Sequence, residues 1–187
     1  MLRVLQRFGV RPDCTAGHSY GELVALRAAD RLDDDGLRRL SRLRGRLMAE
    51  GTGDRGTMVA VQAPLSELDR MLADEGIDVV LANRNSPLQG SLSGTRDAIE
   101  RAVRACTSRG WRTTPLQVSA AFHSMLMAEA GEHFRRALDD IAVSGGSVPV
   151  YANCTAEPYA EVADAVRDTL ARQLVSPVNF VAEIENL

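Results

Sequence analysis

Apolar residues recur along most of this chain at helical spacing, and short strand-like runs separate the helical stretches. Apolar positions three or four residues apart predict helices over residues 2–8, 23–29, 33–50 (capped by the aspartates at 33–35), 65–74, 98–108, 126–142 and 162–174. Short apolar or alternating runs predict strands at residues 14–16, 58–61, 78–82, 90–94, 111–118 and 147–153. Strands that alternate with helices in this way predict an α/β fold.

A glycine-rich stretch, residues 51–56, breaks the helical pattern and predicts a boundary between two units. Beyond it, residues 57–118 follow the order strand, helix, strand, strand, helix, strand. That order is typical of a ferredoxin-like (βαββαβ) subdomain. Residues 1–56 and 119–187 then form the larger unit, into which the small one is inserted.

Composition and charge mainly exclude classes of partner and of chemistry. With 187 residues, 45% of them hydrophobic and 25% charged, the chain is typical of a soluble globular protein with one sizeable core. A net charge of −3 gives no reason to expect nucleic acid or an anionic membrane as a partner. All 22 basic residues are arginine, which excludes a Schiff-base lysine, a lysine general base and a P-loop lysine.

The cysteines are Cys14, Cys106 and Cys154, an odd number at wide spacing. This pattern favours a reducing cytoplasm over a disulfide framework and offers no C-x-x-C pair for a metal or redox site. No apolar run approaches the roughly 20 residues of a membrane span, and no signal peptide is visible. We therefore expect a cytoplasmic protein without a metal site.

Residues 16–22 read Ala-Gly-His-Ser-Tyr-Gly-Glu and fit the G-x-S-x-G pattern of a nucleophile elbow. In such an elbow the serine, here Ser19, sits in a strained conformation on a tight turn between a strand and a helix. Gly17 and Gly21 are both expected to allow close approach of the backbone to neighbouring elements. The Tyr20 N–H, at the start of the following helix, could donate to an oxyanion. The alternative is a glycine-rich turn whose serine does no chemistry.

A serine nucleophile needs a base, and the chain has three histidines. His18 adjoins Ser19, so its side chain points away from the serine. His133 falls among charged residues in a predicted helix, as a solvated surface histidine would. His123 lies in a loop where the small unit rejoins the large one, and a cleft is expected there. His123 is the candidate base by elimination; the alternative is a packed structural histidine.

Five motifs occur in order: GHSYGE at residues 17–22, LRGRLM at 43–48, NSP at 85–87, AFHS at 121–124 and QLVSPV at 173–178. With them the chain resembles the malonyl-CoA:acyl-carrier-protein transacylase family and the acyltransferase domains of polyketide and fatty-acid synthases. The tyrosine after the serine is most similar to domains of iterative synthases of the enediyne and polyunsaturated-fatty-acid type. The resemblance spans nearly the whole chain.

The resemblance implies a role for each matching side chain. Ser19 would carry the acyl ester, and His123 would be its base and later the acid for the leaving thiolate. Arg44 would bind the free carboxylate of a malonyl group, which suits a planar, permanently charged guanidinium. Gln173 would help to orient the histidine in place of a triad aspartate. The other implied site residues are Asn85, near that histidine, and Phe122 and Tyr20, at the substrate.

Two of these positions have alternatives. Arg44 stands among other helix arginines and could be solvated, and Asn85 before Ser-Pro could be an ordinary turn residue. The chain also departs from the family in two places. The Gly-Gln-Gly strand that completes the oxyanion hole does not precede Met1, so the chain is expected to be a fragment of the domain or to have that strand on a separate segment. The His-Ala-Phe-His motif of malonyl-selective domains reads Ala-Ala-Phe-His here, keeping Phe122, whose ring leaves little room for a methyl branch.

Together these features predict an α/β-hydrolase-like core with an inserted ferredoxin-like subdomain. The resemblance implies a ping-pong transfer of malonyl from malonyl-CoA, through Ser19, to the phosphopantetheine thiol of an acyl carrier protein in polyketide (antibiotic) biosynthesis. The implied partners are that carrier protein domain and the other domains of a multidomain synthase, and no bound cofactor is implied. The alternatives are a serine thioesterase or hydrolase and a non-catalytic fragment of a larger synthase.

Overall fold

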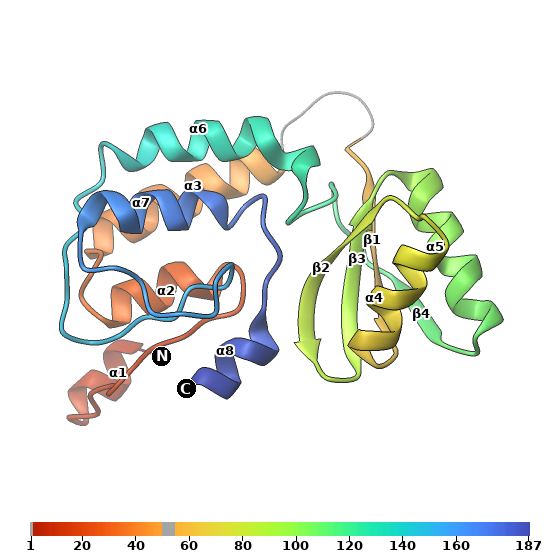
Figure 1. Ribbon diagram of the computed structural model, residues 1–187. Helices are drawn as coiled ribbons and strands as arrows, with labels where there is room; N and C mark the ends of the chain where they lie inside the picture. The colour runs from red at the N-terminus through yellow and green to blue at the C-terminus, as the bar shows by residue number, and fades with distance from the viewer. Residues whose placement is uncertain (1, 50–54) are drawn as a thin grey trace.

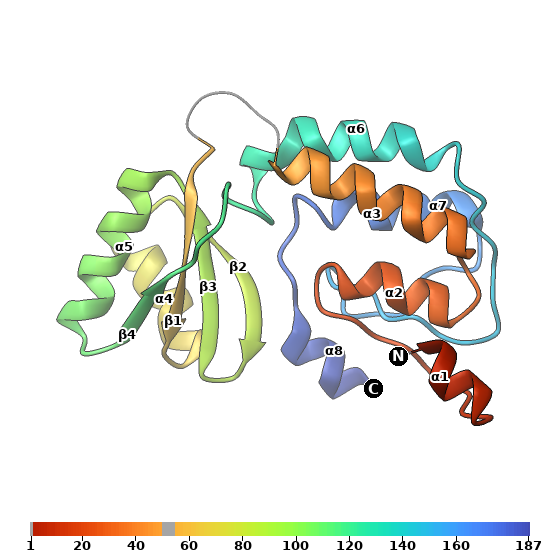
Figure 2. The same ribbon diagram turned by 180° about the vertical axis from the view of Figure 1, so that it is seen from behind.

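The computed structural model describes residues 2–49 and 55–187, and within them a mainly helical part lies beside a small sheet (Figures 1 and 2). The helices are α1 (Leu2–Arg7), α2 (Gly21–Ala28), α3 (Asp34–Ala49), α4 (Leu65–Asp74), α5 (Arg96–Ser108), α6 (Ala128–Leu138), α7 (Ala163–Arg172) and α8 (Phe180–Asn186), with a 3-10 turn, η1, at Met125–Met127. The strands are β1 (Thr57–Gln62), β2 (Val79–Ser86), β3 (Gln89–Gly94) and β4 (Arg112–Pro115).

The small sheet is antiparallel in the order β2-β3-β1-β4. Its elements follow the chain in the order predicted for residues 57–118. Helices α4 and α5 pack on one face of the sheet, and Val59, Leu68, Leu92 and Ala102 are buried between the layers. The β2 strand continues to Ser86, past the predicted end at Ala82, so Asn85 lies in a strand and the interpretation as a turn residue is wrong.

The larger part is built from α2, α3, α6 and α7, and α6 lies beside both α3 and α7 (Figure 1). Leu26, Leu40, Phe134 and Leu170, one from each helix, are buried in its core. The aspartate cap predicted for α3 is present, since Asp33 accepts a hydrogen bond from the Gly36 N–H over 2.6 Å.

Two predicted strands of the larger part are wrong. Residues 14–16 pair with residues 147–153 at a single parallel bridge, between Thr15 and Val150. Tyr151 forms a separate antiparallel bridge with Pro158. Two short parallel segments lack the run of hydrogen bonds that makes a ladder stable, and Pro149 cannot donate one. Thr15 and Ala16 are also only half-buried.

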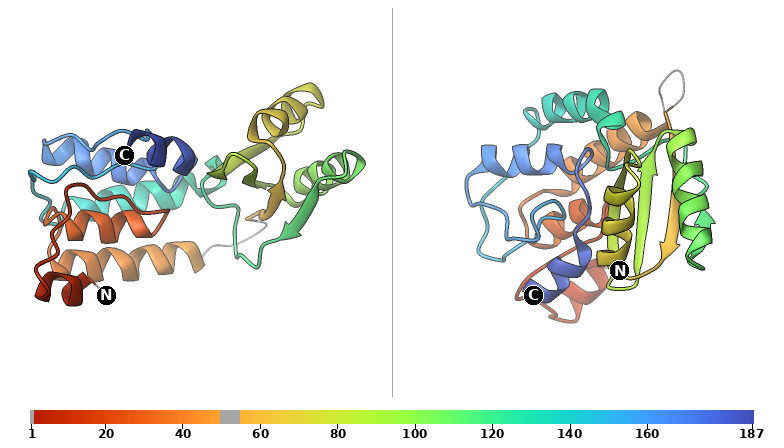
Figure 3. Two further views of the ribbon diagram at one scale, coloured as in Figure 1. Left: turned by 90° about the horizontal axis from the view of Figure 1, so that it is seen from below. Right: turned by 45° about the vertical axis from the view of Figure 1, so that its right-hand side comes forward.

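Two predicted helices need correction as well, and one helix was missed. None of the residues of α1 is buried, and Phe8, the last residue of the helix predicted over 2–8, lies beyond its end and is 83% exposed. The helix predicted over 126–142 is the η1 turn followed by a shorter α6. Helix α8, the dark blue helix at the C-terminus in Figure 3, was not predicted at all. It follows a segment in which Val178 forms a single parallel bridge with Asn83 of the edge strand β2.

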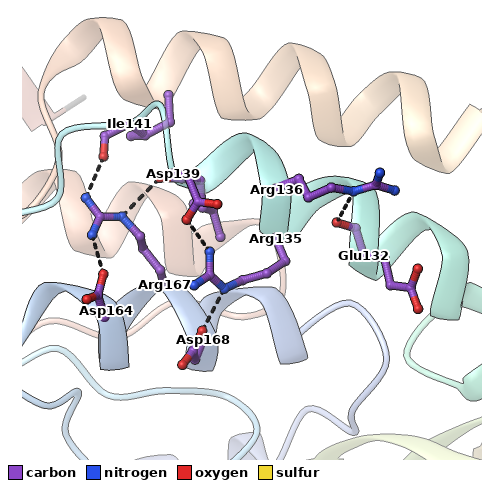
Figure 4. Close-up of polar contacts among 9 residues, drawn as sticks. Glu132, Arg135, Arg136, Asp139, Ile141, Asp164, Arg167 and Asp168 are labelled. Carbon is purple, nitrogen blue, oxygen red and sulfur yellow. Dashed lines mark hydrogen bonds and ion pairs between the residues drawn. The ribbon is translucent and has the colours of Figure 1, made fainter.

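Arginine joins α6 to α7 (Figure 4). Arg167 of α7 donates to the carbonyl oxygens of Leu138 (3.0 Å) and Ile141 (3.0 Å), where α6 ends and its last carbonyls lack helical partners. Arg135 of α6 reaches back to Asp168 over 2.6 Å. None of the helices among the described residues is long and apolar enough to cross a bilayer.

Candidate active site

Four helices of the larger part have one end on the side that faces the small sheet (Figure 1). These ends are the start of α2, the end of α3, the start of α6 with the η1 turn before it, and the end of α7. Ser19 precedes α2, Arg44 lies in the second half of α3, His123 precedes η1 and α6, and Gln173 follows α7. Residues far apart in the sequence are thus brought together by the packing of four helices.

Ser19 sits on a turn with φ of +53°, a left-handed conformation that is strained for any residue but glycine. The N–H groups of Gly21 and Glu22 close the turn onto the carbonyl oxygens of His18 (2.9 Å) and Ser19 (3.1 Å). The strained serine predicted from the elbow pattern is confirmed. His123 also has a positive φ, +57°, so Ser19 and His123 both lie on strained backbone.

The two elbow glycines do not share one role. A Cβ at Gly17 would lie 2.2 Å from the backbone carbonyl of Gly21, whereas a Cβ at Gly21 would meet nothing within 4 Å. The expectation of close approach is therefore confirmed for Gly17 and wrong for Gly21.

Gly17→Ala is expected to destabilise the protein and disturb the serine, because the clash is with backbone that cannot rotate away. Overpacking of this kind costs about 1–3 kcal/mol. Gly21→Ala is the matched control and should stay within about 1 kcal/mol of the wild type, since alanine is the better helix former. Thermal unfolding of the two variants measures the contrast; equal melting temperatures would contradict the packing argument.

The Ser19 hydroxyl contacts a base and a cation at once. Its Oγ lies 2.9 Å from His123 Nε2 and 3.0 Å from Arg44 Nη2. The other ring nitrogen of His123, Nδ1, lies 2.8 Å from the carbonyl oxygen of Gln173. A carbonyl oxygen only accepts, so Nδ1 carries the proton and Nε2 is free to accept one from the serine.

Burial sets the protonation state of this base. His123 is 3% exposed, and loss of hydration lowers its pKa to about 4, with the positive charge of Arg44 contributing to the same effect and the Gln173 carbonyl opposing it. The imidazole is therefore neutral near pH 7.

Arg44 is 3% exposed, so the interpretation as a solvated helix arginine is wrong. Its Nε has no hydrogen-bond partner among the described residues, and burial lowers its pKa. The guanidinium nevertheless stays charged. Its centre lies 5.9 Å from the Tyr20 ring, whose hydroxyl is 2.9 Å from Ser41 Oγ. A buried cation with an unused donor beside a serine hydroxyl is suited to bind an anionic group.

Three other predicted site residues, Gln173, Asn85 and Phe122, lie around this serine, histidine and arginine. Gln173 accepts from His123 through its backbone, while its side-chain Nε2 donates to the Ser19 carbonyl oxygen over 2.6 Å. Asn85 Oδ1 lies 2.7 Å from Nε2 of His18 and thus contacts the residue beside the nucleophile. Phe122 is half-buried and packs against a small apolar cluster with Leu47.

The sequence did not reveal a buried polar group behind the elbow. Asn153, Glu22, Glu183 and Tyr159 are 4% exposed or less, and they are linked to one another by hydrogen bonds. Glu22 belongs to the GHSYGE motif and was the one available signal, because a glutamate on the inner face of a helix needs partners. In the described parts of the chain, no group of three or more His, Cys, Asp or Glu side chains could hold a metal ion.

Comparison with known proteins gives a consistent result. The model of the family described as "Acyl transferase domain" matches residues 1–187. The malonyl CoA-acyl carrier protein transacylase of Bacillus subtilis is 37% identical over 100% of this chain and 61% of its own length. The polyketide biosynthesis protein PksE of the same organism is also 37% identical, over 100% of this chain and 24% of its own length.

Solved structures agree. The acyltransferase domain of an iterative polyketide synthase in enediyne biosynthesis is 36% identical with a TM-score of 0.91, over 98% of this chain and 48% of that one. A malonyl CoA-acyl carrier protein transacylase from Burkholderia pseudomallei is 32% identical with a TM-score of 0.89, over 98% of this chain and 63% of that one. The chain thus spans about a quarter to two thirds of the length of these four proteins. Its α/β fold with a small antiparallel sheet is that of acyltransferase domains, and the chain belongs to the acyl transferase domain family.

Proposed function

We propose that this protein transfers a malonyl group from malonyl-CoA, through an ester on Ser19, to the phosphopantetheine thiol of an acyl carrier protein in polyketide biosynthesis. One observation carries the proposal: a single serine oxygen lies within 3.0 Å of both a neutral histidine and a buried arginine. The histidine supplies a base for acyl transfer, and the arginine supplies a partner for an acyl group that ends in a carboxylate.

In the first half-reaction His123 Nε2 takes the Ser19 proton as Oγ forms a bond to the thioester carbonyl carbon. The Tyr20 N–H has no hydrogen-bond partner among the described residues and stands at the N-terminus of α2, so it is available to the oxyanion. Collapse of the tetrahedral adduct breaks the carbon–sulfur bond, and His123 returns the proton to the CoA thiolate. The carrier thiol then reverses these steps and releases Ser19.

Arg44 would bind the free malonyl carboxylate throughout. Its buried Nε has no partner among the described residues, and its Nη2 already reaches the serine oxygen. A carboxylate bound there by two nitrogens would supply the missing hydrogen bond and neutralise a buried charge. This favours transfer of malonyl over the thioesterase alternative, because an acyl chain without a carboxylate leaves the guanidinium unpaired.

The finer architecture also belongs to this proposal. The strand order β2-β3-β1-β4, with both helices on one face, supports a ferredoxin-like subdomain over residues 57–118. The elbow and the parallel contact between Thr15 and Val150 support an α/β-hydrolase-like core over residues 1–56 and 119–187. The mechanism uses the side chains of Ser19, His123 and Arg44 and the backbone N–H of Tyr20, without a bound cofactor or metal. Its partners would be a carrier protein and neighbouring synthase domains, in the cytoplasm.

Incubation with radiolabelled malonyl-CoA tests the activity. We expect label on the peptide that contains Ser19, and transfer of that label to a pantetheinylated carrier protein added afterwards. Ser19→Ala should take up none, and Ser124→Ala, which alters a second buried serine of the site region, should still be labelled. Release of label as free malonate at the same rate with and without the carrier would favour the hydrolase. If the folded wild type takes up no label and releases no labelled malonate, malonyl transfer is rejected.

A further inference from the structure

Asn153 is buried in a loop of the larger part and lies 134 residues beyond Ser19 in the chain. Its side-chain Oδ1 accepts a hydrogen bond from the Ser19 N–H over 2.6 Å. Its Nδ2 donates to the Gly17 carbonyl oxygen over 2.9 Å. One amide group therefore holds the backbone on both sides of His18, which forms the tip of the elbow.

This contact falls where the elbow needs support. A left-handed backbone costs a residue such as serine about 1–2 kcal/mol, so it persists only where surrounding contacts impose it. The Ser19 N–H is fixed by Asn153, and the Ser19 carbonyl oxygen is fixed by Gln173 Nε2 over 2.6 Å. The φ and ψ of Ser19, and hence the direction of its side chain, are set between these two amides.

The Asn153 amide is itself held from behind. Its Nδ2 also donates to Glu183 Oε2 over 2.8 Å, and its backbone N–H donates to Glu22 Oε1 over 3.3 Å. The Tyr159 hydroxyl donates to the same Glu22 oxygen. Both carboxyl groups are buried, and loss of hydration raises the pKa of each to about 7. Two acceptors on Nδ2 and a donor on Oδ1 also fix which way the amide faces.

We propose that Asn153 is a positioning residue for Ser19: its amide binds both arms of the elbow, with Glu22 and Glu183 behind it, and so keeps the serine oxygen between His123 and Arg44. The proposal rests on the proposed function, in that Ser19 is taken as the nucleophile. It assigns a role in catalysis to a residue that touches neither substrate nor base.

A fluorophosphonate probe tests this without malonyl-CoA or a carrier, because Ser19 Oγ displaces fluoride from phosphorus and only an activated serine reacts. Asn153→Ala should react about 10- to 100-fold more slowly than the wild type. In malonyl transfer the same variant should lower kcat while KM stays near the wild-type value. Asn179→Ala is the matched control, since Asn179 Nδ2 donates to the Cys154 carbonyl oxygen, one residue from Asn153, and not to the elbow. It should react at the wild-type rate.

Asn153→Asp separates positioning from folding. A protonated aspartic acid both donates and accepts, like the amide, whereas the ionised form only accepts and would repel the Gly17 oxygen and Glu183. The charged and titratable groups around it are Glu22, Glu183, Tyr159 and Cys154. Arg44 interacts electrostatically with Glu22, and His18 lies between the two backbone groups that the amide holds. Surrounded by carboxyl groups, the new acid takes up its proton as the pH falls. The rate at which Asn153→Asp reacts with the fluorophosphonate, divided by the wild-type rate, should therefore rise as the pH is lowered from 8 to 6.

The outcomes reject different proposals. If the wild type fails to react with the probe, Ser19 is not activated, and the proposed function falls together with the positioning role. If the wild type reacts and the folded Asn153→Ala reacts equally fast, the positioning role alone is overturned. If Asn153→Ala does not fold, the Asn153→Asp profile decides, and a relative rate that is constant from pH 8 to 6 overturns the proposal.

Discussion

Replacing His123 by alanine is expected to slow acylation of Ser19 by malonyl-CoA by about 10²–10⁴-fold, the usual contribution of general base catalysis. The serine hydroxyl lies 2.9 Å from Nε2, and the ring is fixed in the accepting tautomer by the Gln173 carbonyl. Rapid-quench measurement of the labelled acyl-enzyme gives the rate directly. His133→Ala is the control, because His133 lies on the surface of α6 with a 50% exposed side chain. A similar loss in both variants would contradict the assignment.

The pH dependence gives the same prediction a second readout. A base works in its neutral form, and burial lowers the pKa of His123 to about 4. The acylation rate of the wild type should therefore stay flat from pH 8 down to about pH 5. A histidine with its ordinary pKa of about 6.5 would already have lost about tenfold at pH 5.5. A profile that bends near pH 6.5 would mean that the ring is hydrated in the working enzyme.

The sequence was most informative where function depends on local geometry. The elbow pattern predicted the strained Ser19 because the turn is formed by consecutive residues. The element order of residues 57–118 was also predictable, since strands and helices of a small antiparallel unit carry their own periodicity. Strands were wrongly predicted at 14–16 and 147–153, because a parallel pairing depends on neighbours far away in the chain rather than on local pattern.

The buried polar group was beyond such reasoning. Asn153 and Glu183 are far from the elbow in the sequence, and an asparagine in a loop is usually a turn residue. Their roles arise only when the loop after Tyr151 and the start of α8 are packed against α2. Burial of Arg44 could not be predicted from α3 either, because the four other arginines of that helix, Arg38, Arg39, Arg42 and Arg46, are exposed.

Arg44→Ala is expected to lower kcat/KM for malonyl-CoA by about 10²–10³-fold and that for acetyl-CoA by only a few-fold. Each hydrogen bond between a charged donor and acceptor contributes about 1.5–3 kcal/mol, and a bidentate carboxylate makes two of them. Acetyl-CoA has a methyl group where malonyl-CoA has its free carboxylate, so with this donor the variant loses only the contact between Arg44 Nη2 and the serine oxygen. Comparing the two donors in one assay measures the change in selectivity.

Two further variants separate this role from stability and from surface charge. Arg44→Met keeps an apolar stem of similar length and removes a buried cation whose Nε has no partner among the described residues, so its melting temperature should not fall. It should still lose malonyl selectivity. Arg46→Ala, two positions along the same helix and exposed, should keep both selectivity and rate. Equal losses for acetyl-CoA and malonyl-CoA in the Arg44 variants would mean that the guanidinium supports Ser19 alone, and the malonyl carboxylate would then have to bind elsewhere.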